Sequence, residues 1–430
     1  MSGQTPSTSD ETTSATREKA ASGALIVAAL VGIYMLSQFF RNALGVIGPD
    51  IARAFDLDAA QLGFLSSIFF LSFALAQIPL GIAIDRWGPR PAMLATVALM
   101  IGSTILFALA RNYTELALAR MLMGLGCCSF LMAPLALYAE RFPPAKFSTM
   151  TGIHIGGGSI GMLAATAPLA WLTDHAGWRN SFLTAAAIAA VMAVCVFLFA
   201  HETPETLARR RERSETLAQA AAGVAAATRA PGFWRMFFIQ AATYSAFASI
   251  IGLWVGPWLS QVYGLQIEKR GLMTLILAVA QIAGLFFWGA SDRWFASYRR
   301  PALIGIVLAL ATLAAGALVV LPGAALPLFM AAFGFAFAIT PVLTAQGTAL
   351  FPRELTGRGM TLINSGVIGG AFVQQAFTGF VIEAFGSKIV EGVRIYPPQA
   401  FQLVFGLLAL QLMVATYFYL RAPDLHPERL

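Results

Sequence analysis

The stretch "LGIAIDRWGPRPAM" occupies Leu80–Met93 and lies between two long apolar runs. Its charged triplet Asp85-Arg86-Trp87 occurs once more, as Asp292-Arg293-Trp294, 207 residues further along the chain. Charged residues make up only 11% of the 430 residues, whereas roughly 25% is usual for a soluble domain. A repeated charged triplet in so apolar a chain indicates a duplicated unit, in which short polar loops return at corresponding positions.

Long apolar runs make up most of the chain, since 58% of its residues are hydrophobic. A helix of about 20 apolar residues crosses the hydrocarbon core of a bilayer, because lipid offers the backbone no other hydrogen-bond partners. The sequence therefore predicts an all-α polytopic membrane protein, with the lipid bilayer as its permanent partner. Twelve spans are expected, at residues 24–50, 61–83, 92–110, 116–138, 149–172, 180–200, 235–261, 270–289, 301–321, 326–349, 357–383 and 399–420.

The longest connection between spans, residues 201–232, divides the chain into halves of six spans each. Phe142-Pro143 matches Phe351-Pro352 at an offset of 209 residues, close to the offset of the charged triplet, so the halves look like two copies of one unit. Six spans per copy make the copies parallel, and substrate sites in such proteins lie near the midplane between them. The expected divisions are a disordered cytoplasmic tail at 1–22, a bundle at 23–200, the cytoplasmic linker at 201–232, a second bundle at 233–421 and a tail at 422–430.

Basic residues are distributed unevenly about the spans. Most of the 28 Lys and Arg residues fall in the segments on the side of the two termini, and the positive-inside rule places that side in the cytoplasm. The net charge of +7 thus reports topology and gives no reason to expect a nucleic-acid partner. We expect a multi-pass protein of the plasma membrane, here a bacterial inner membrane, that acts as a monomer.

The sequence pattern holds no residues arranged for covalent or metal chemistry. Cys127, Cys128 and Cys195 all fall inside spans, where free cysteines pack as small apolar residues. The sequence carries no Walker loop, no zinc-ligand spacing and no pairing of a nucleophile with a base. It therefore predicts neither an enzyme nor a protein that holds a metal ion or another cofactor.

The segment "GIAIDRWGPR", between the second and third spans, has the form G-x-x-x-D-R-x-G-x-R. It resembles the signature loop of the major facilitator superfamily, and "WGASDRW", followed by Arg299-Arg300, resembles a weaker echo between the eighth and ninth spans. With the twelve spans and the duplication, the resemblance covers about residues 24–421. It implies the fold of that superfamily, two bundles of six transmembrane helices, and transport by alternating access.

The signature loop offers a charged cluster at the cytoplasmic end of the second span. There Asp85 can meet Arg86, Arg90 and the positively polarised N-terminus of the eleventh span when the halves close on that side. Such a cluster stabilises one conformation and must break for the other, as a gate requires. The alternative is that the arginines only fix topology. The expected gating residues are Asp85, Arg86, Gly88, Arg90, Asp292 and Arg293.

Arg41 is a charged residue inside the first span, and an ionised side chain at a helix centre costs roughly 2.5–3.5 kcal/mol. Tyr34, Gln38 and Arg41 recur at intervals of four and three residues and so share one helix face. A polar face that ends in a guanidinium suits an anion, because the guanidinium donates a fork of hydrogen bonds to carboxylate or phosphate. The alternative is that Arg41 extends to the external membrane interface.

His154, in "GIHIGGGSIGM" of the fifth span, lies on a face of small residues that allows a helix or a cavity to approach closely. It can donate to an anion or change charge near neutral pH, or it can be a neutral packing residue. Three features also resemble the organophosphate:phosphate antiporters, of the glycerol-3-phosphate transporter and sugar phosphate permease type. They are Tyr34 seven residues before Arg41, His154 in the fifth span, and "ETP" at 202–204. That resemblance implies contacts of Arg41 and His154 with the anionic group of the substrate.

The resemblance to those antiporters fails in the seventh span. The family has a second basic residue one repeat after the first, whereas Ala248 stands there with no Lys or Arg nearby. A single arginine neutralises a monoanion better than a phosphate dianion, so we expect a carboxylate rather than a sugar phosphate. In the second half Tyr244, Asn364 and Gln375 are expected to contact the substrate; for each amide the alternative is a bond between helices.

Arg120, in "ARMLMGLG", matches a pattern that in the superfamily often accompanies proton-driven export. No Asp or Glu lies near the middle of a span, so proton coupling would have to use His154 or a displaced water network, and the possible coupling residues are Arg120 and His154. The leading hypothesis is a secondary transporter, an antiporter or symporter, that moves a small organic anion together with a coupling ion or a counter-substrate. The alternatives are a proton-coupled exporter of drugs or neutral metabolites and a transporter-like sensor that transports nothing.

Overall fold

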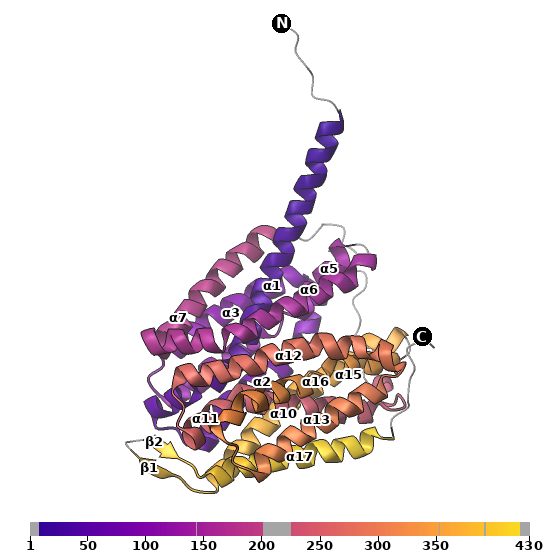
Figure 1. Cartoon of the computed structure of the whole chain (residues 1–430). Coiled ribbons are helices and arrows are strands. Elements are labelled where there is room, and N and C mark those ends of the chain that lie inside the picture. The colour runs from indigo at the N-terminus through magenta and orange to yellow at the C-terminus, as the bar shows by residue number, and fades with distance from the viewer. Residues whose placement is uncertain (1–7, 143, 201–224, 352, 391–392, 422–430) are drawn as a thin grey trace.

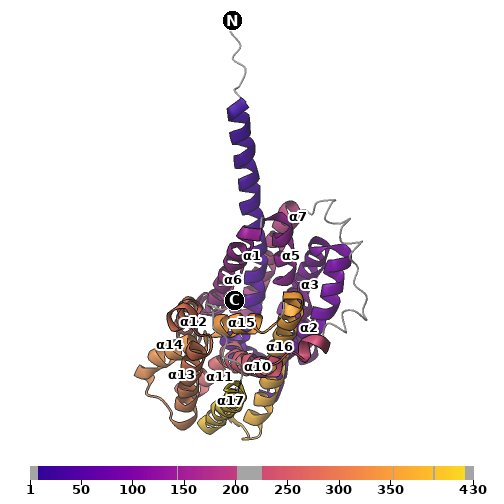
Figure 2. The same cartoon turned by 90° about the vertical axis from the view of Figure 1, so that its right-hand side faces the viewer.

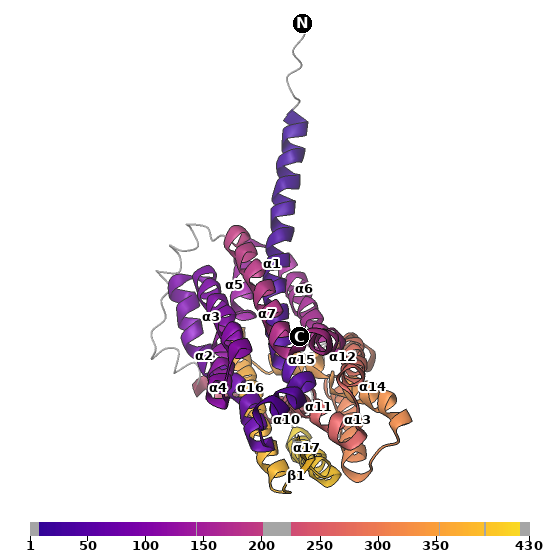
Figure 3. The same ribbon diagram turned by 90° about the vertical axis from the view of Figure 1, so that its left-hand side faces the viewer.

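The computed structural model describes residues 8–142, 144–200, 225–351, 353–390 and 393–421. Within these ranges the protein is helical apart from turns and one short hairpin, in which β1 (Lys388–Val390) pairs antiparallel with β2 (Val393–Ile395). The helices of the two halves form two bundles side by side, the first drawn in indigo to magenta and the second in orange to yellow (Figure 1). Views from the two sides keep the bundles distinct (Figure 2 and Figure 3).

In the described ranges, the first bundle contains seven helices that make six membrane crossings. α4 and α5 together form the fourth crossing, and α6 with the start of α7 forms the fifth. The chain then turns at Gly177 within α7, whose φ of +81° is one that glycine adopts easily. The helices are α1 (Thr8–Phe55), α2 (Ala59–Trp87), α3 (Pro89–Leu109), α4 (Tyr113–Cys127), α5 (Met132–Arg141), α6 (Pro144–Ala164) and α7 (Ala167–Phe199).

Within the part of the chain that the structure describes, the crossings number twelve, as the sequence predicts. Among the described residues eleven helical segments are long and apolar enough to span a bilayer, but one of them, Thr149–Phe199, has 51 residues. Within it, Arg179 donates to the carbonyl oxygen of Ala110 at the end of α3, and Arg90 at the start of α3 donates to that of Phe197. The later part of α7 therefore runs antiparallel to α3, and the long segment crosses twice.

The second bundle repeats this arrangement. Its first crossing contains a short π-helix, η1, between α10 and α11, and π-helices occur frequently at functional sites. α14 and α15 form one broken crossing, like α4 and α5 in the first bundle. The elements are α10 (Phe233–Ser249), η1 (Ile250–Trp254), α11 (Val255–Tyr263), α12 (Ile267–Phe295), α13 (Arg299–Leu318), η2 (Gly323–Ala325), α14 (Leu326–Phe337), α15 (Thr340–Ala349), α16 (Arg353–Glu383) and α17 (Pro398–Tyr419).

Both broken crossings carry a proline just after the break. Pro134 lies in the first turn of α5 and Pro341 in the first turn of α15, 207 residues apart. Proline lacks an N–H group and its ring clashes with the carbonyl four residues earlier, so the helix cannot continue undisturbed through either position. The breaks thus fall at corresponding places in the two halves, which agrees with the duplication inferred from the sequence.

The N-terminal segment differs from the expectation of a disordered tail at residues 1–22. α1 already begins at Thr8 and projects from the first bundle (Figure 1). The segment "TREKAASGAL" contains several good helix formers, and extending a formed helix requires no new nucleus. The expected linker at 201–232 is described only from residue 225, and the expected tail at 422–430 lies outside the described residues.

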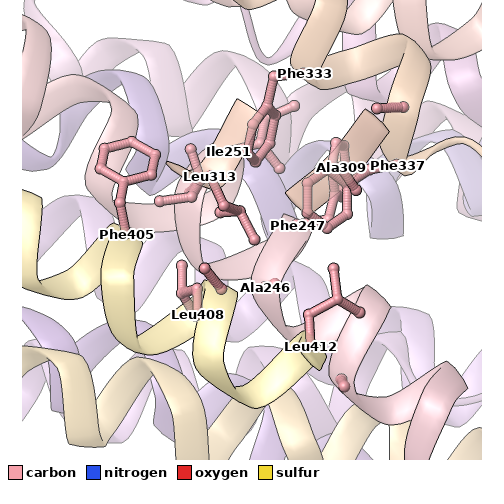
Figure 4. Close-up of a cluster of buried hydrophobic side chains, with 14 of the residues drawn as sticks. Ala246, Phe247, Ile251, Ala309, Leu313, Phe333, Phe337, Phe405, Leu408 and Leu412 are labelled. Atoms are coloured by element: carbon pink, nitrogen blue, oxygen red, sulfur yellow. The ribbon is translucent and has the colours of Figure 1, made fainter. Parts of the chain in front are cut away.

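Each bundle packs around a hydrophobic core of its own. In the second bundle the ring centroids of Phe333 and Phe337 are 4.6 Å apart, and the same cluster includes Leu313 (Figure 4). In the first bundle Phe107 and Phe182 lie at the same centroid distance, 4.6 Å. Because each half has its own core, the halves can move relative to each other as two bodies.

Glycines bring the two halves into backbone contact toward one face, called here the hairpin face because β1 and β2 lie there. The opposite face, at which α17 ends, is called the terminal face. A Cβ on Gly45 of α1 would lie 1.8 Å from the carbonyl oxygen of Ile251 in η1. A Cβ on Gly63 of α2 would lie 2.9 Å from the Cα of Gly379 in α16. At both helix crossings only glycine permits so close an approach.

Candidate functional site

A cavity of about 500 Å³ lies between the two bundles, lined from one half by α1, α2 and the break after α4, and from the other by α10, α15 and α16. Its lining residues lie near the middle of these crossings or between the middle and the terminal face. The polar ones are Tyr34, Gln38, Arg41, Gln77, Gln240, Thr243, Tyr244, Thr340, Thr344, Thr361 and Asn364. The others are Phe73, Cys128, Leu131, Met132, Leu343, Met360, Ile363, Val367 and Ile368.

Arg41 is the only charged side chain among the described residues that line the cavity. Its guanidinium carbon lies 4.4 Å from the centroid of the Phe73 ring, and Nη1 lies 3.5 Å from the hydroxyl of Tyr244, at the limit of a hydrogen bond. Nε is buried and has no partner among the described residues. The guanidinium therefore faces the interior between the halves, keeps unused donors, and has no described carboxylate to neutralise it.

Five of the other polar groups of the cavity fall into two sets. The side chains of Tyr34, Gln38 and Asn364 make no hydrogen bond with another described residue, so they keep their full capacity for a ligand. Gln77 and Gln240 instead donate to backbone carbonyl oxygens of their own halves, at 3.4 and 3.2 Å. The first set includes groups from both halves, and a ligand bound between them would touch both.

The structure brings five of the seven substrate residues proposed from the sequence to one cavity: Tyr34, Gln38 and Arg41 from α1, Tyr244 from α10 and Asn364 from α16. The polar face expected on the first span is therefore turned toward the second half. The remaining two residues, a histidine and a glutamine, lie elsewhere.

His154 lies outside the cavity, against its wall. It is fully buried, with Nε2 3.0 Å from the carbonyl oxygen of Phe130 and Nδ1 3.2 Å from the hydroxyl of Tyr138. A neutral ring satisfies both, because Nε2–H donates to the carbonyl and the tyrosine donates to Nδ1. The ring also stacks on Tyr34 with 4.8 Å between centroids. Both nitrogens are in use, so His154 positions Tyr34 instead of binding the ligand itself.

Gln375 and Arg120 also lie outside the cavity. The amide of Gln375 donates to the carbonyl oxygen of Ala248 at 2.9 Å and so joins α16 to α10. Arg120 is fully buried in the first bundle, where Nη1 donates to the carbonyl oxygen of Phe40 at 2.9 Å. Arg120 and His154, the two candidates for proton coupling, thus both serve packing between helices in this conformation.

The gate expected at the signature loop is described only in part. Gly88 separates α2 from α3 with a φ of +95°, which favours glycine. Nη2 of Arg90 donates to the carbonyl oxygen of Phe197 at 2.9 Å, and the guanidinium of Arg86 lies 5.9 Å from the centroid of the Trp87 ring. The other expected members have side chains outside the described set, and their pairing stays a prediction: Asp85, Asp292 and Arg293.

Sequence reasoning missed part of the cavity wall. Phe73 lies one helical turn before Gln77 on α2 and supports the guanidinium of Arg41. Thr340 and Thr344 line the opposite side, from the start of α15. Their spacing of four residues indicates a shared helix face, but only the break before α15 shows that this face is turned to the cavity.

One group of described side chains away from the cavity has the donors of a metal site. Ligand atoms of Asp174, His175 and Glu268 lie within 4.8 Å of one another, and all three residues are exposed. Exposed carboxylates gather in this way without an ion, so we assign no metal to this group.

The family follows from the comparison with known proteins. Residues 30–373 match the family model described as Major Facilitator Superfamily. The chain belongs to the major facilitator superfamily. A solved structure with this superfamily fold is that of a bacterial homologue of the human lysosomal transporter Spinster, in an inward-facing and unoccupied conformation. It is 20% identical, the match covers 92% of this chain and 96% of that one, and the TM-score is 0.76. At that identity the likeness shows the fold alone.

Curated relatives in the superfamily include transporters of organic acids. The chain is 25% identical to a probable L-galactonate transporter of Escherichia coli, over 60% of this chain and 59% of that protein. It is 26% identical to a gallate transporter of Pseudomonas putida, over 79% and 81%. The chain spans between 40% and 81% of the length of the first three curated relatives that it matches. The names of these relatives refer to transporters and to no enzyme, and none of the three names an organophosphate.

Proposed function

We propose that this chain transports a small organic monoanion, with a carboxylate rather than a phosphate ester as its charged group, by alternating access. The observation that carries the proposal is the solitary guanidinium of Arg41, which faces a cavity between two separately packed bundles. The charge of one guanidinium is matched by one carboxylate, and the two groups pair through two parallel hydrogen bonds. A phosphate dianion would keep a second negative charge with no described cation near it.

The uncharged lining supports a substrate that carries hydroxyl groups as well. Gln38 and Asn364 present amides from opposite halves, and Thr340 adds a hydroxyl. The names of the relatives agree with this chemistry, since galactonate and gallate are hydroxylated carboxylates. We therefore place the carboxylate at Arg41 and the hydroxyl groups between the two amides.

We further propose that the terminal face is cytoplasmic, that the membrane is a bacterial inner membrane and that the monomer is the working unit. The excess of basic residues on the terminal side supports this orientation. In it, the hairpin face is external and closed, and the cavity lies toward the cytoplasm. A counter-substrate or a coupling ion completes the cycle, as in antiport or symport.

Substitution of Arg41 tests the proposal directly. In proteoliposomes containing purified protein, labelled gallate and labelled galacturonate, a hydroxylated monocarboxylate like galactonate, should be taken up, and glucose 6-phosphate should compete weakly. Arg41→Gln should reduce uptake about tenfold or more, because a hydrogen bond to a charged group contributes about 1.5–3 kcal/mol. Arg41→Lys should recover part of the loss, since it restores charge without the fork.

Arg111→Gln is the matched control, because Arg111 is exposed in the turn between α3 and α4, away from the cavity. It should leave uptake unchanged. Competition by the phosphate ester stronger than by either carboxylate would contradict the proposed substrate class, and wild-type kinetics in Arg41→Gln would remove Arg41 from the site.

A further inference from the structure

Among the described residues, two ion pairs join the halves at the hairpin face, and they differ in burial. Arg270 in the first turn of α12 places Nη2 2.8 Å from Oδ2 of Asp50 in α1, and their side chains are 5% and 25% exposed. Arg394 in β2 pairs with Asp56 at 3.1 Å, but these side chains are 31% and 67% exposed. Exposed pairs contribute little, because water screens them and two mobile side chains must be ordered. The buried pair is therefore the one that distinguishes a closed face from an open one.

A third contact at this face uses a backbone amide. The N–H of Ala59, at the start of α2, donates to Oε2 of Glu383 at 3.0 Å and to the hydroxyl of Tyr396 at 2.9 Å. Burial raises the pKa of the Tyr396 hydroxyl, as does its hydrogen bond with Glu383, so the hydroxyl stays protonated and donates to that carboxylate. The first half contributes only a backbone N–H to this contact, so no substitution of a side chain in that half would remove it.

We propose that Arg270 controls the transport cycle by holding the hairpin face closed through Asp50. The inference rests on the proposed alternating-access function and identifies a positioning residue for it. Arg270 lines no part of the cavity, so it acts on the equilibrium between conformations and not on the bound substrate.

Because Arg270 is buried, the stability of the closed conformation depends on its pairing with Asp50. The residue is only 4% exposed, and its Nε is buried with no partner among the described residues. α12 packs tightly against the first bundle beside it, since a Cβ on Gly271 would lie 2.4 Å from Cβ of Ala170 in α7. With the face closed, water cannot replace Asp50 as the partner of the guanidinium. With the face open, both partners are hydrated and need no pairing.

The difference in burial predicts an asymmetry between the two partners. Removing Asp50 leaves a buried, unpaired cation in the closed conformation alone, which strongly destabilises that conformation. Removing Arg270 leaves the carboxylate of Asp50 unpaired, but this side chain is already 25% exposed to water. The closed conformation of that variant is therefore destabilised less. Removing both leaves no unpaired charge, and replacement of a buried pair by apolar residues is often neutral or stabilising. The double variant should therefore close again.

Distances between spin labels across the hairpin face measure this equilibrium without any substrate. The labels replace Arg111 of the first half and Val320 of the second, both exposed at this face, in a chain whose three cysteines are changed to serine. In the purified full-length protein, Asp50→Ala should raise the ratio of long to short distances about tenfold or more, because a lone buried charge is strongly disfavoured. Arg270→Met should raise it less, and the combination Asp50→Ala with Arg270→Met should return it near the wild-type value.

Asp56→Ala is the matched control, since it removes the exposed pair at the same face, and it should leave the distances unchanged. Asp50→Asn serves as a second single variant if Asp50→Ala does not yield folded, monodisperse protein. Wild-type distances in both Asp50 variants would overturn the proposal, as would a double variant that stays as open as Asp50→Ala. If the distances respond as expected but no monoanion is transported, the proposed substrate fails and the role of Arg270 stands.

Discussion

Arg41 combines features that a lysine at the same place would not provide. Its planar guanidinium lies over Phe73 and reaches the hydroxyl of Tyr244 in the other half. A guanidinium stacks on an aromatic ring and still presents a fork of donors at its edge, whereas an ammonium is a strongly hydrated point charge. We therefore expect the residue to hold the proposed carboxylate in one orientation while it contacts both halves.

His154 should affect the stability of the folded protein and not its affinity for the substrate. His154→Phe keeps a ring against Tyr34 but leaves the Tyr138 hydroxyl and the Phe130 carbonyl oxygen without a partner. An unsatisfied buried polar group costs about 1–3 kcal/mol, so thermal unfolding should occur at a lower temperature. Galacturonate affinity of the folded variant, measured by calorimetry, should stay close to that of the wild type. A loss of affinity as large as in Arg41→Gln would place His154 in the site after all.

One element, α1, joins the cavity to the closed face. Over about two and a half turns it carries Arg41 at the cavity, Gly45 against η1, and Asp50 paired with Arg270. A helix is stiff over this length, so a small rotation of α1 at the ligand is transmitted to the contacts at the hairpin face. The π-helix η1 lies directly opposite Gly45, where a locally irregular helix allows the partner to adjust.

The crossing at Gly45 should tolerate no larger residue. Gly45→Val brings a side chain against the carbonyl oxygen of Ile251, and overpacking of this kind costs about 1–3 kcal/mol. Galacturonate uptake should therefore fall about tenfold or more at matched protein levels. Gly102→Val is the control with the same chemistry, because a Cβ there meets nothing within 4 Å. Equal uptake by the two variants would show that the close approach is unimportant.

At the level of elements the sequence was a good guide to the crossings and a poor one to their interruptions. Twenty-residue apolar runs and the repeated triplet are properties of the chain itself, so the twelve crossings and the duplication could be predicted. The breaks before Pro134 and Pro341 and the π-helix lie within runs that stay apolar throughout. Hydropathy does not register them, because they arise from backbone hydrogen bonding.

The site was predictable where one helix defines it. Tyr34, Gln38 and Arg41 share a face of α1 at spacings that the sequence shows directly. The position of His154 outside the cavity was not predictable, because its partners come from the neighbouring crossing and no spacing along its own helix reveals them. Thr340 was missed for the same reason, since only the packing of the two halves turns it toward the cavity.

For the whole molecule, two independently packed bundles closed at one face imply access from the other. Cys128 lines the cavity, whereas Cys127 does not, so a variant with Cys127→Ser and Cys195→Ser reports on that access. A small methanethiosulfonate should modify Cys128 faster from the cytoplasmic side than from outside. Bound galacturonate should slow the reaction, because it occupies the same cavity. Equal rates from the two sides of oriented vesicles, or no protection, would argue against a single closed face.

The unneutralised charge of Arg41 also has an electrical consequence. With a monoanion bound the cavity is neutral, whereas the empty cavity carries a positive charge across part of the membrane field each time access switches. One elementary charge crossing the full field corresponds to about 2.3 kcal/mol per 100 mV. In the proposed orientation, an inside-negative voltage should therefore hold the empty carrier open to the cytoplasm and leave the loaded carrier unaffected. Exchange of one anion for another does not require the empty carrier to reorient. Net accumulation does require that step and must overcome its voltage-dependent cost.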